Sequence, residues 1–270
     1  MDEIRAREGW FVLHLFYRVD RACWKGRDPS ERSKMRECFK QLIAGFREAE
    51  NCQAYLYSVP GHKADMAVML VDPELQHLNQ MENDILEAFA PGILEPVYSF
   101  VSMSEISEYM SSEEDYDRTL REKEGLAPDS SEYQQKMENF RQKMQPYIHD
   151  RLYLKVPKHR VMCFYPMSKA RGEQKNWYTL DFKTRKELMG GHLMSGRKYA
   201  GKVKQWVTGS AGLDDWEWGV TLFADDPQYL KQIVYEMRFD EVSAVYGQFG
   251  DFLVGIHLEP NELFERLKLG

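Results

Sequence analysis

The stretch DMAVMLVDP at residues 65–73 has a counterpart in WGVTLFADDP at residues 218–227. In each, an apolar run typical of a buried strand leads into an Asp-Pro dipeptide. The acid suits the positive end of a helix, and proline suits the first helical turn. Both stretches therefore predict a strand followed by a helix, and their shared form indicates an internal duplication.

The predicted elements on either side of these stretches occur in the same order in both halves of the chain. The first half predicts strand 10–19, helix 29–48, strands 53–58 and 65–71, helix 73–89 and strand 96–103. The second half predicts strand 161–166, helix 184–201, strands 203–208 and 218–223, helix 227–246 and strand 252–257. Each half is thus a β-α-β-β-α-β unit, which is the ferredoxin-like order.

A ferredoxin-like sheet with its helices on one face leaves the other face apolar, so two such sheets can bury these faces against each other. We therefore expect an α+β fold of two ferredoxin-like β-α-β-β-α-β domains packed sheet to sheet, as in a dimeric α/β-barrel. The expected domains are residues 1–110 and 151–270. The polar segment 111–150 joins them, and its apolar residues recur at helical spacing, which predicts an amphipathic helix that packs on the domains: Tyr133, Met137, Phe140, Met144 and Tyr147.

Composition narrows the class of protein. The chain has 270 residues, of which 43% are hydrophobic, and its net charge of -7 argues against a nucleic-acid partner, because phosphate binding needs a concentrated basic surface. The four cysteines lack a paired CxxC spacing, so they favour free thiols in a reducing cytosol over a zinc or iron-sulfur site. Since no signal sequence or apolar run of membrane length occurs, we expect a cytoplasmic protein without a membrane span.

His192 is the candidate metal ligand. The predicted helix 184–201 starts with a capping-box pattern at Thr184 and carries His192 after the pair Gly190-Gly191. Two glycines inside a helix each weaken it by roughly 1 kcal/mol relative to alanine, and their missing side chains could let a flat macrocycle approach the backbone. A neutral imidazole is a common axial ligand of haem iron, with its second nitrogen bound to an acceptor that the sequence does not identify. Taken alone, a helical histidine is more often structural.

Three further side chains accompany this histidine. Tyr165 ends a predicted strand before Pro166, which aims a phenol at the sheet edge or a cavity, where an oxidised iron centre could take an electron and a proton from it. Lys169 follows four residues later, and its ammonium could hold a carboxylate. Gln205 lies in the strand after the His192 helix, where a buried carboxamide needs a hydrogen-bond partner such as iron-bound water or peroxide. A core tyrosine, a surface lysine and a backbone-bonded glutamine are the structural alternatives.

Several ordered motifs resemble one family. They are YPMSK at 165–169, NWY at 176–178, GRKYAGKV at 196–203, DWEWGVTLF at 215–223 and YEMRFDE at 235–241. Together they resemble the coproheme decarboxylases, a branch of the chlorite dismutase-like superfamily. The similarity is dense across Arg151 to Gly255 and rests mainly on element order across Trp10 to Met103.

The resemblance implies a fold, an activity and a set of roles. It implies a homopentamer with the porphyrin in the C-terminal domain. His192 would be the proximal iron ligand, Gln205 would occupy the distal position, Tyr165 would form the radical that attacks the propionates, and Lys169 would position the reacting group. Further residues would surround the macrocycle or its propionates: Arg151, Met167, Arg197, Trp216, Arg238 and Ser243. The substrate would be iron-coproporphyrin III (coproheme), oxidised by hydrogen peroxide to haem b, with transient contact to the ferrochelatase that supplies it.

Two residues depart from the family pattern, and two other functions stay open. Family members commonly carry glycine where this chain has Leu193 and arginine where it has Ala170. A chlorite dismutase is one alternative, but dismutases place arginine at the position of Gln205 to hold the oxyanion. A non-catalytic haem or porphyrin carrier is the other, because a fold alone does not determine function.

Overall fold

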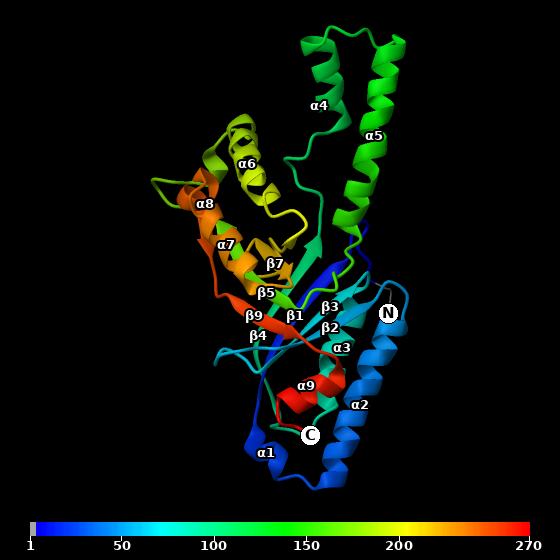
Figure 1. Ribbon diagram of the computed structural model, residues 1–270, viewed down its shortest axis with the longest axis vertical. Coiled ribbons are helices and arrows are strands. Elements are labelled where there is room, and N and C mark those ends of the chain that lie inside the picture. The colour runs from blue at the N-terminus through cyan, green and yellow to red at the C-terminus, as the bar shows by residue number, and fades with distance from the viewer. Residues whose placement is uncertain (1–3) are drawn as a thin grey trace.

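The computed structural model describes residues 4–270, so residues 1–3 of the expected N-terminal domain lie outside the described part (Figure 1). The N-terminal unit contains β1 (Phe11–Val19), α1 (Arg21–Lys25), α2 (Pro29–Glu48), β2 (Gln53–Ser58), β3 (Met66–Asp72), α3 (Leu75–Glu87) and β4 (Leu94–Ser104). The C-terminal unit contains β5 (Val161–Lys169), η2 (Trp177–Thr179), α6 (Phe182–Arg197), β6 (Lys204–Gly209), β7 (Trp218–Ala224), α7 (Pro227–Met237), α8 (Glu241–Tyr246), β8 (Gly247–Phe249), β9 (Leu253–His257) and α9 (Pro260–Arg266).

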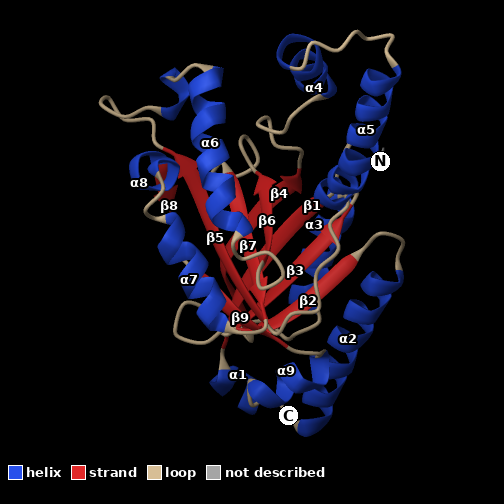
Figure 2. Ribbon diagram, turned by 45° about the horizontal axis from the view of Figure 1, so that its top comes forward, coloured by secondary structure: helices blue, strands red, loops and turns tan. Residues whose placement is uncertain are grey.

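The strands form a closed antiparallel barrel. The N-terminal unit has the strand order β4-β1-β3-β2, and the C-terminal unit has the matching order β9-β5-β7-β6. Pairing between β2 and β9 and between β4 and β6 joins the two units at both edges. Figure 2 shows the strands gathered at the centre with helices around them. The expected pair of ferredoxin-like units is confirmed, and their sheets are continuous through backbone hydrogen bonds.

The barrel interior is filled by large side chains. Because successive residues of a strand point to opposite faces, alternate positions enter the barrel. In β5, Phe164 points inward and packs near Phe100, with ring centroids 5.3 Å apart, whereas Tyr165 points outward. The interior cluster includes Val12, Phe16, Tyr57, Met69, Phe100, Met162, Phe164, Trp206, Phe223 and Leu253. This interior is a packed core rather than a ligand cavity.

Helices cover the outer faces of the barrel to different extents. In the N-terminal unit, α2 buries Phe39 and Ile43 against the sheet, and α3 and α9 extend the same core. In the C-terminal unit, α7 buries Leu230 and Ile233 on an outer-face cluster that also contains Tyr165, Val220 and Leu222. No helix within residues 4–270 has the length and apolar character needed to cross a membrane.

The segment between the units forms a helical arm. It contains α4 (Glu113–Arg118), the π-helical turn η1 (Thr119–Lys123) and α5 (Ser131–Leu152), and it projects away from the barrel in Figure 1. The predicted amphipathic helix is present, but its packing on both domains was predicted wrongly. Tyr133 and Met137 pack on Leu120 within the arm, and only the last turn reaches the barrel, where Ser104 Oγ donates to the Leu152 carbonyl.

Three predicted helices differ from the structure. The helix expected over 73–89 begins at Leu75, with Glu74 as its N-cap, so Asp72 and Pro73 lie outside it. The continuous helix expected over 227–246 is wrong, because the chain ends α7 at Met237 and Asp240 caps a new helix, α8, by accepting from the backbone N–H of Ser243 at 3.0 Å. The capping box expected at Thr184 is also wrong. Asp181 is the N-cap of α6, and Thr184 is the residue whose N–H it accepts, at 2.9 Å. The sequence prediction also missed α1 and α9.

One substitution tests how tightly the barrel closes. A Cβ at Gly255 in β9 would lie 2.6 Å from Tyr57 Cβ in β2. We therefore expect Gly255→Ala to lower the free energy of unfolding by about 1–3 kcal/mol, as overpacking does. Gly45→Ala in α2 is the matched control, because open space surrounds that position and a helical alanine should stabilise by about 0.5–1 kcal/mol. Urea unfolding monitored by circular dichroism measures both, and equal effects of the two variants would contradict the close contact.

Candidate functional site on the outer face of the C-terminal unit

Strand register brings several predicted site residues to one face. Tyr165 and Val207 both pair with Val220, and Gln205 pairs with the next outward residue of β7, Leu222. Since alternate residues share a face, Met167 and Lys169 lie on the same side of β5 as Tyr165. The phenol, the amine and the carboxamide therefore share the outer face of the C-terminal sheet.

Helix α6 lies over this region without closing it. The helix packs against α7 and α8 rather than against the sheet, and none of its residues is fully buried. A Cβ placed at Gly190 or Gly191 would meet nothing within 4 Å, so the space beside this turn is open. The helix that carries His192 is therefore held by its neighbours and presents a bare backbone surface.

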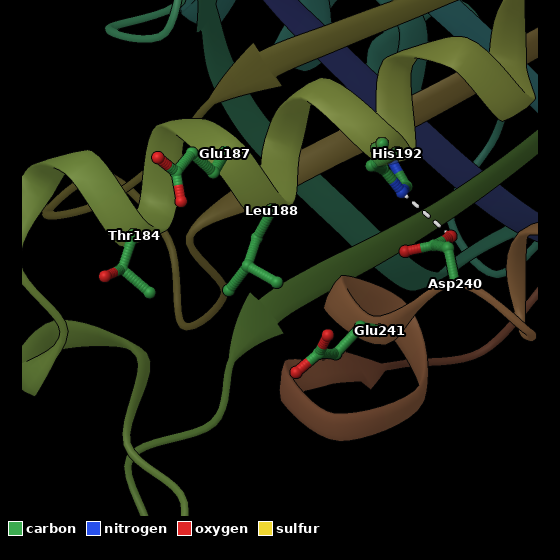
Figure 3. A pocket seen from close by; sticks show the side chains of 7 residues that line it. Thr184, Glu187, Leu188, His192, Asp240 and Glu241 are labelled. Carbon is green, nitrogen blue, oxygen red and sulfur yellow. Dashed lines mark hydrogen bonds and ion pairs between the residues drawn. The ribbon is translucent and has the colours of Figure 1, made fainter.

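His192 is anchored by a carboxylate. Its Nδ1 lies 3.0 Å from Asp240 Oδ2 (Figure 3). Ser243 Oγ donates to the same oxygen at 3.2 Å. Burial lowers the pKa of His192, while the charge of Asp240 opposes this effect. With Nδ1 held as the donor, Nε2 is the ring nitrogen left for another partner. Beside the histidine is a cavity of about 340 Å³, lined by Thr184, Glu187, Leu188, Gly191, His192, Asp240 and Glu241.

Lys169 is buried beside this pair. Only 7% of the residue is exposed, and its Nζ lies 4.7 Å from the centre of the Trp177 ring, within the range of a cation–π contact. Its backbone N–H donates to Glu217 Oε2 at 2.7 Å, which holds the end of β5. Burial lowers the pKa of Lys169 to about 8, against the opposing charges of Asp240 and Glu217. An amine with this pKa can give up or hold a proton near neutral pH.

Tyr165 is a buried, neutral phenol. Its ring stacks on Phe252 with centroids 4.3 Å apart and meets Phe249 edge-on at 6.0 Å. Burial raises the pKa of Tyr165, and the nearby guanidinium of Arg238 partly opposes this. Within residues 4–270, the Tyr165 hydroxyl makes no hydrogen bond, and the residue does not line the His192 cavity. The phenol is therefore kept protonated and without a fixed partner.

The remaining predicted residues divide into two groups. Arg238, at the end of α7, places its guanidinium 5.5 Å from the Phe249 ring and so lies beside Tyr165, while Arg197 is exposed at the end of α6. Arg151 and Trp216 lie elsewhere. Arg151 lies in the last turn of α5, where its Nε is buried without a partner among the described residues, and Trp216 packs against the barrel-interior cluster. Of these four residues, Arg238 lies beside Tyr165, Arg197 lies on the helix that carries His192, and Arg151 and Trp216 lie on other elements.

Three residues of the site were missed by sequence reasoning. Asp240 supplies the acceptor for His192, and it was hidden because the predicted helix ran through it. Its signal is an acid placed three residues before Ser243, a pattern typical of a helix start. Trp177 and Glu217 hold Lys169 through contacts between distant segments, which spacing along the chain does not reveal.

Comparison with known proteins identifies the family. The model of the chlorite dismutase family matches residues 32–258. The chain belongs to the chlorite dismutase family. This membership confirms the resemblance read from the sequence motifs, and it accounts for the paired ferredoxin-like units.

Relatives of this chlorite dismutase family member include both enzymes and haem-binding proteins. A coproheme decarboxylase of Staphylococcus carnosus (strain TM300) is 41% identical over 261 residues, which cover 96% of this chain and 95% of the relative. The structure of a heme-binding protein from Thermus thermophilus is 40% identical, with a TM-score of 0.81 over 99% of this chain and 98% of that one. A mutant chlorite dismutase from Candidatus Nitrospira defluvii shares the fold at 17% identity, with a TM-score of 0.72 and coverage of 97% of both chains.

The Asp240 contact predicts the titration of His192. Since the carboxylate raises the pKa of the imidazole against burial, Asp240→Asn should lower that pKa further while keeping the cap of α8. Lys169→Met should have the opposite effect, because the Lys169 charge lowers the pKa of His192. NMR titration of the His192 ring measures both directions. Shifts of the same sign in the two variants would contradict this electrostatic arrangement.

Buried Lys169 predicts a stability change with pH. A lysine whose pKa falls from its ordinary 10.5 to about 8 on folding weakens the fold by up to about 3 kcal/mol below pH 8. Between these values the unfolded chain binds the proton that the folded chain releases, so this penalty is relieved as pH rises. Lys169→Met should therefore be more stable than the natural protein at pH 7, and the gain should shrink towards pH 10.5. Urea unfolding at both pH values measures it, and a gain that grows with pH would contradict the assignment.

Proposed function

We propose that this protein catalyses the peroxide-dependent oxidative decarboxylation of two propionates of iron-coproporphyrin III, which gives haem b. The observation that carries the proposal is the Asp240-held His192 above the sheet face that presents Tyr165, Lys169 and Gln205. The coproheme decarboxylase relative, 41% identical over nearly the whole chain, supports the same reaction.

The residues of the site fit an iron porphyrin in three respects. Asp240 leaves His192 Nε2 as the ring nitrogen for iron, in the arrangement usual for axial histidines. The open space at Gly190 and Gly191 admits a flat ring beside the helix. Because α6 buries none of its side chains fully, it can also move at small free-energy cost to admit a macrocycle between His192 and Gln205.

The reaction balances for each propionate. One propionate, one hydrogen peroxide and one proton give one vinyl group, one carbon dioxide and two waters. Two electrons and a proton leave the side chain as the carbon–carbon double bond forms and the bond to the carboxylate breaks. The bound iron supplies the oxidation by peroxide, so coproheme is both redox centre and substrate.

Tyr165 is the residue that passes the oxidation to the propionate. Its raised pKa keeps the phenol neutral, so it loses an electron and a proton together and then takes a hydrogen atom from the propionate carbon. The absence of a hydrogen-bond partner among the described residues leaves its oxygen free to face the substrate arm. The stacked ring of Phe252 and the edge-on ring of Phe249 exclude water from the radical.

Charged side chains hold the carboxylates of the substrate. Lys169, with its pKa of about 8, binds the reacting carboxylate or provides the proton that the balance requires. Arg238 lies beside Tyr165 and Arg197 at the exposed end of α6, and each hydrogen bond to a charged group is worth about 1.5–3 kcal/mol. Gln205 offers a neutral amide on the distal side, which suits peroxide better than an oxyanion such as chlorite.

Assembly and location form part of the same proposal. The chain assembles as a homopentamer in the cytoplasm and receives coproheme from a ferrochelatase by transient contact. Exposed apolar rings support assembly: Tyr235 and Phe239 on the α7 side are 64% and 73% exposed, and their centroids lie 5.1 Å apart. The four cysteines are free, as is typical of a reducing compartment.

The phenol gives the direct test of this function. We expect the purified protein with coproheme and peroxide to produce two successive losses of the mass of formic acid, measured by mass spectrometry. Tyr165→Phe should lower the rate by at least about a hundredfold, which corresponds to about 2.7 kcal/mol in the barrier. Tyr199→Phe is the matched control, because Tyr199 packs on the same outer-face cluster but donates its hydroxyl to Glu236 at 2.8 Å.

Two results would overturn the proposal. Carbon dioxide release by Tyr165→Phe at the natural rate would remove Tyr165 from the reaction. Coproheme that binds tightly to the natural protein and survives peroxide unchanged would instead identify a porphyrin carrier.

A further inference from the structure

Three metal-ligating side chains converge in the N-terminal unit, which the proposed reaction does not use. Cys52 directly precedes β2, Asp72 ends β3 and His77 lies in the first turn of α3. Asp72 Oδ2 lies 3.0 Å from Cys52 Sγ and 2.7 Å from His77 Nδ1, and the sulfur and nitrogen are 3.8 Å apart. A thiol, a carboxylate and an imidazole from three elements thus present one atom each to a common point.

These distances are close to those of a tetrahedral metal site. Zinc bonds of about 2.0–2.3 Å place neighbouring ligand atoms about 3.3–3.7 Å apart. The sulfur-to-nitrogen distance of 3.8 Å is about 0.1 Å longer than this range, whereas the two distances to Asp72, 3.0 and 2.7 Å, are shorter, as expected for hydrogen-bonded pairs. Exchanging the protons for a cation needs shifts of only about 0.5 Å in the side chains.

The environment of Asp72 favours a cation. The residue is 1% exposed, and burying an ionised carboxylate is unfavourable unless it is paired or binds a metal. Its second oxygen, Oδ1, accepts from the backbone N–H of Glu74 at 2.7 Å, which fixes the orientation of the carboxylate. Oδ2 is thus directed at Cys52 and His77, in the way that outer contacts commonly orient a metal ligand.

The donor set selects the kind of metal. Thiolate and imidazole favour zinc and similar borderline cations over magnesium or calcium, which prefer oxygen ligands. The His77 side chain is 43% exposed, so solvent can reach the cluster and occupy a fourth position. Burial and the nearby carboxylate of Asp72 raise the pKa of Cys52 to about 12, so metal binding must displace the thiol proton.

The cluster is particular to the N-terminal unit. In the duplicated C-terminal unit, the residue before the second strand is Val203 rather than Cys52, and the fourth residue after the proline of the Asp-Pro pair is Lys231 rather than His77. Only the acid of the Asp-Pro pair recurs, as Asp226. The shared fold therefore does not require these donors.

We propose that Cys52, Asp72 and His77 form a zinc site, with water as the fourth ligand, that ties β2, β3 and α3 together. The site is separate from His192 and serves stability rather than the decarboxylation. Zinc bound only by the folded state stabilises that state by an amount that grows with the logarithm of the zinc concentration above the dissociation constant, so added zinc raises the melting temperature.

Zinc titration of the full-length protein, freed of porphyrin and treated with a chelator, tests the site. We expect one zinc ion per chain by calorimetry and a thiolate-to-metal absorption band when cobalt(II) replaces zinc. Cys52→Ser should abolish that band, and both Cys52→Ser and His77→Ala should weaken zinc binding by more than about tenfold. Added zinc should raise the melting temperature of the natural protein and not of these variants.

Two controls separate this site from other thiols and histidines. Cys38→Ser removes an exposed thiol on α2, and His192→Ala removes the proposed iron ligand, so both should bind zinc like the natural protein. Coproheme decarboxylation by Cys52→Ser should be unchanged, and its circular dichroism spectrum should match the natural one. Absence of zinc binding, equal affinity in Cys52→Ser, or loss of binding in either control would overturn the proposal.

Discussion

Closure of the barrel is the constraint on which the rest of this structure depends. The edges that would remain free in two separate ferredoxin-like sheets are paired, β2 with β9 and β4 with β6. Closed pairing leaves no exposed edge, and the inward side chains fill the space between the sheets. A large ligand therefore has to bind outside the barrel, between a sheet and its covering helices.

The two units share one fold but differ in how their first helices cover the sheet. In the N-terminal unit, α2 buries Phe39, Ile43 and Phe46 against the sheet and seals that face. The corresponding helix of the C-terminal unit, α6, fully buries none of its residues and carries Gly190 and Gly191 beside His192. Duplication thus gave one closed face for stability and one accessible face for chemistry.

The strands were predicted well from the sequence, because the apolar residues of each strand form a local pattern that reflects its burial. The apolar runs gave the order of both units, and the Asp-Pro pair marks the start of α7 at Pro227. The predicted strand 161–166 ended before Lys169, so the shared face of Tyr165 and Lys169 on β5 was not predicted. The break between α7 and α8 was not predicted, because Asp240 is only one polar residue inside an otherwise helical pattern. The contact of Asp240 with His192 and the contact of Cys52 with His77 arise from tertiary structure, so the hydrophobic periodicity of the sequence does not predict them.

The family resemblance assigned roles to residues that local sequence patterns could not identify. Some of these residues lie close to one another in the structure, and others do not. Tyr165 and Arg238 both contact the ring of Phe249, whereas Lys169 lies at the end of β5 beside Trp177. Arg151 and Trp216 are set apart at the end of α5 and beside the barrel interior.

Helix α6 has no fully buried residue, and this weak packing has a consequence for the protein in the cell. A helix with an internal glycine pair and no fully buried side chain opens more readily than its neighbours, and opened segments are where proteases cut. If His192 binds the porphyrin iron as proposed, the bound substrate adds contacts that hold this helix in place. Copies that carry porphyrin should therefore outlive empty ones, which couples the abundance of the protein to the supply of its own substrate.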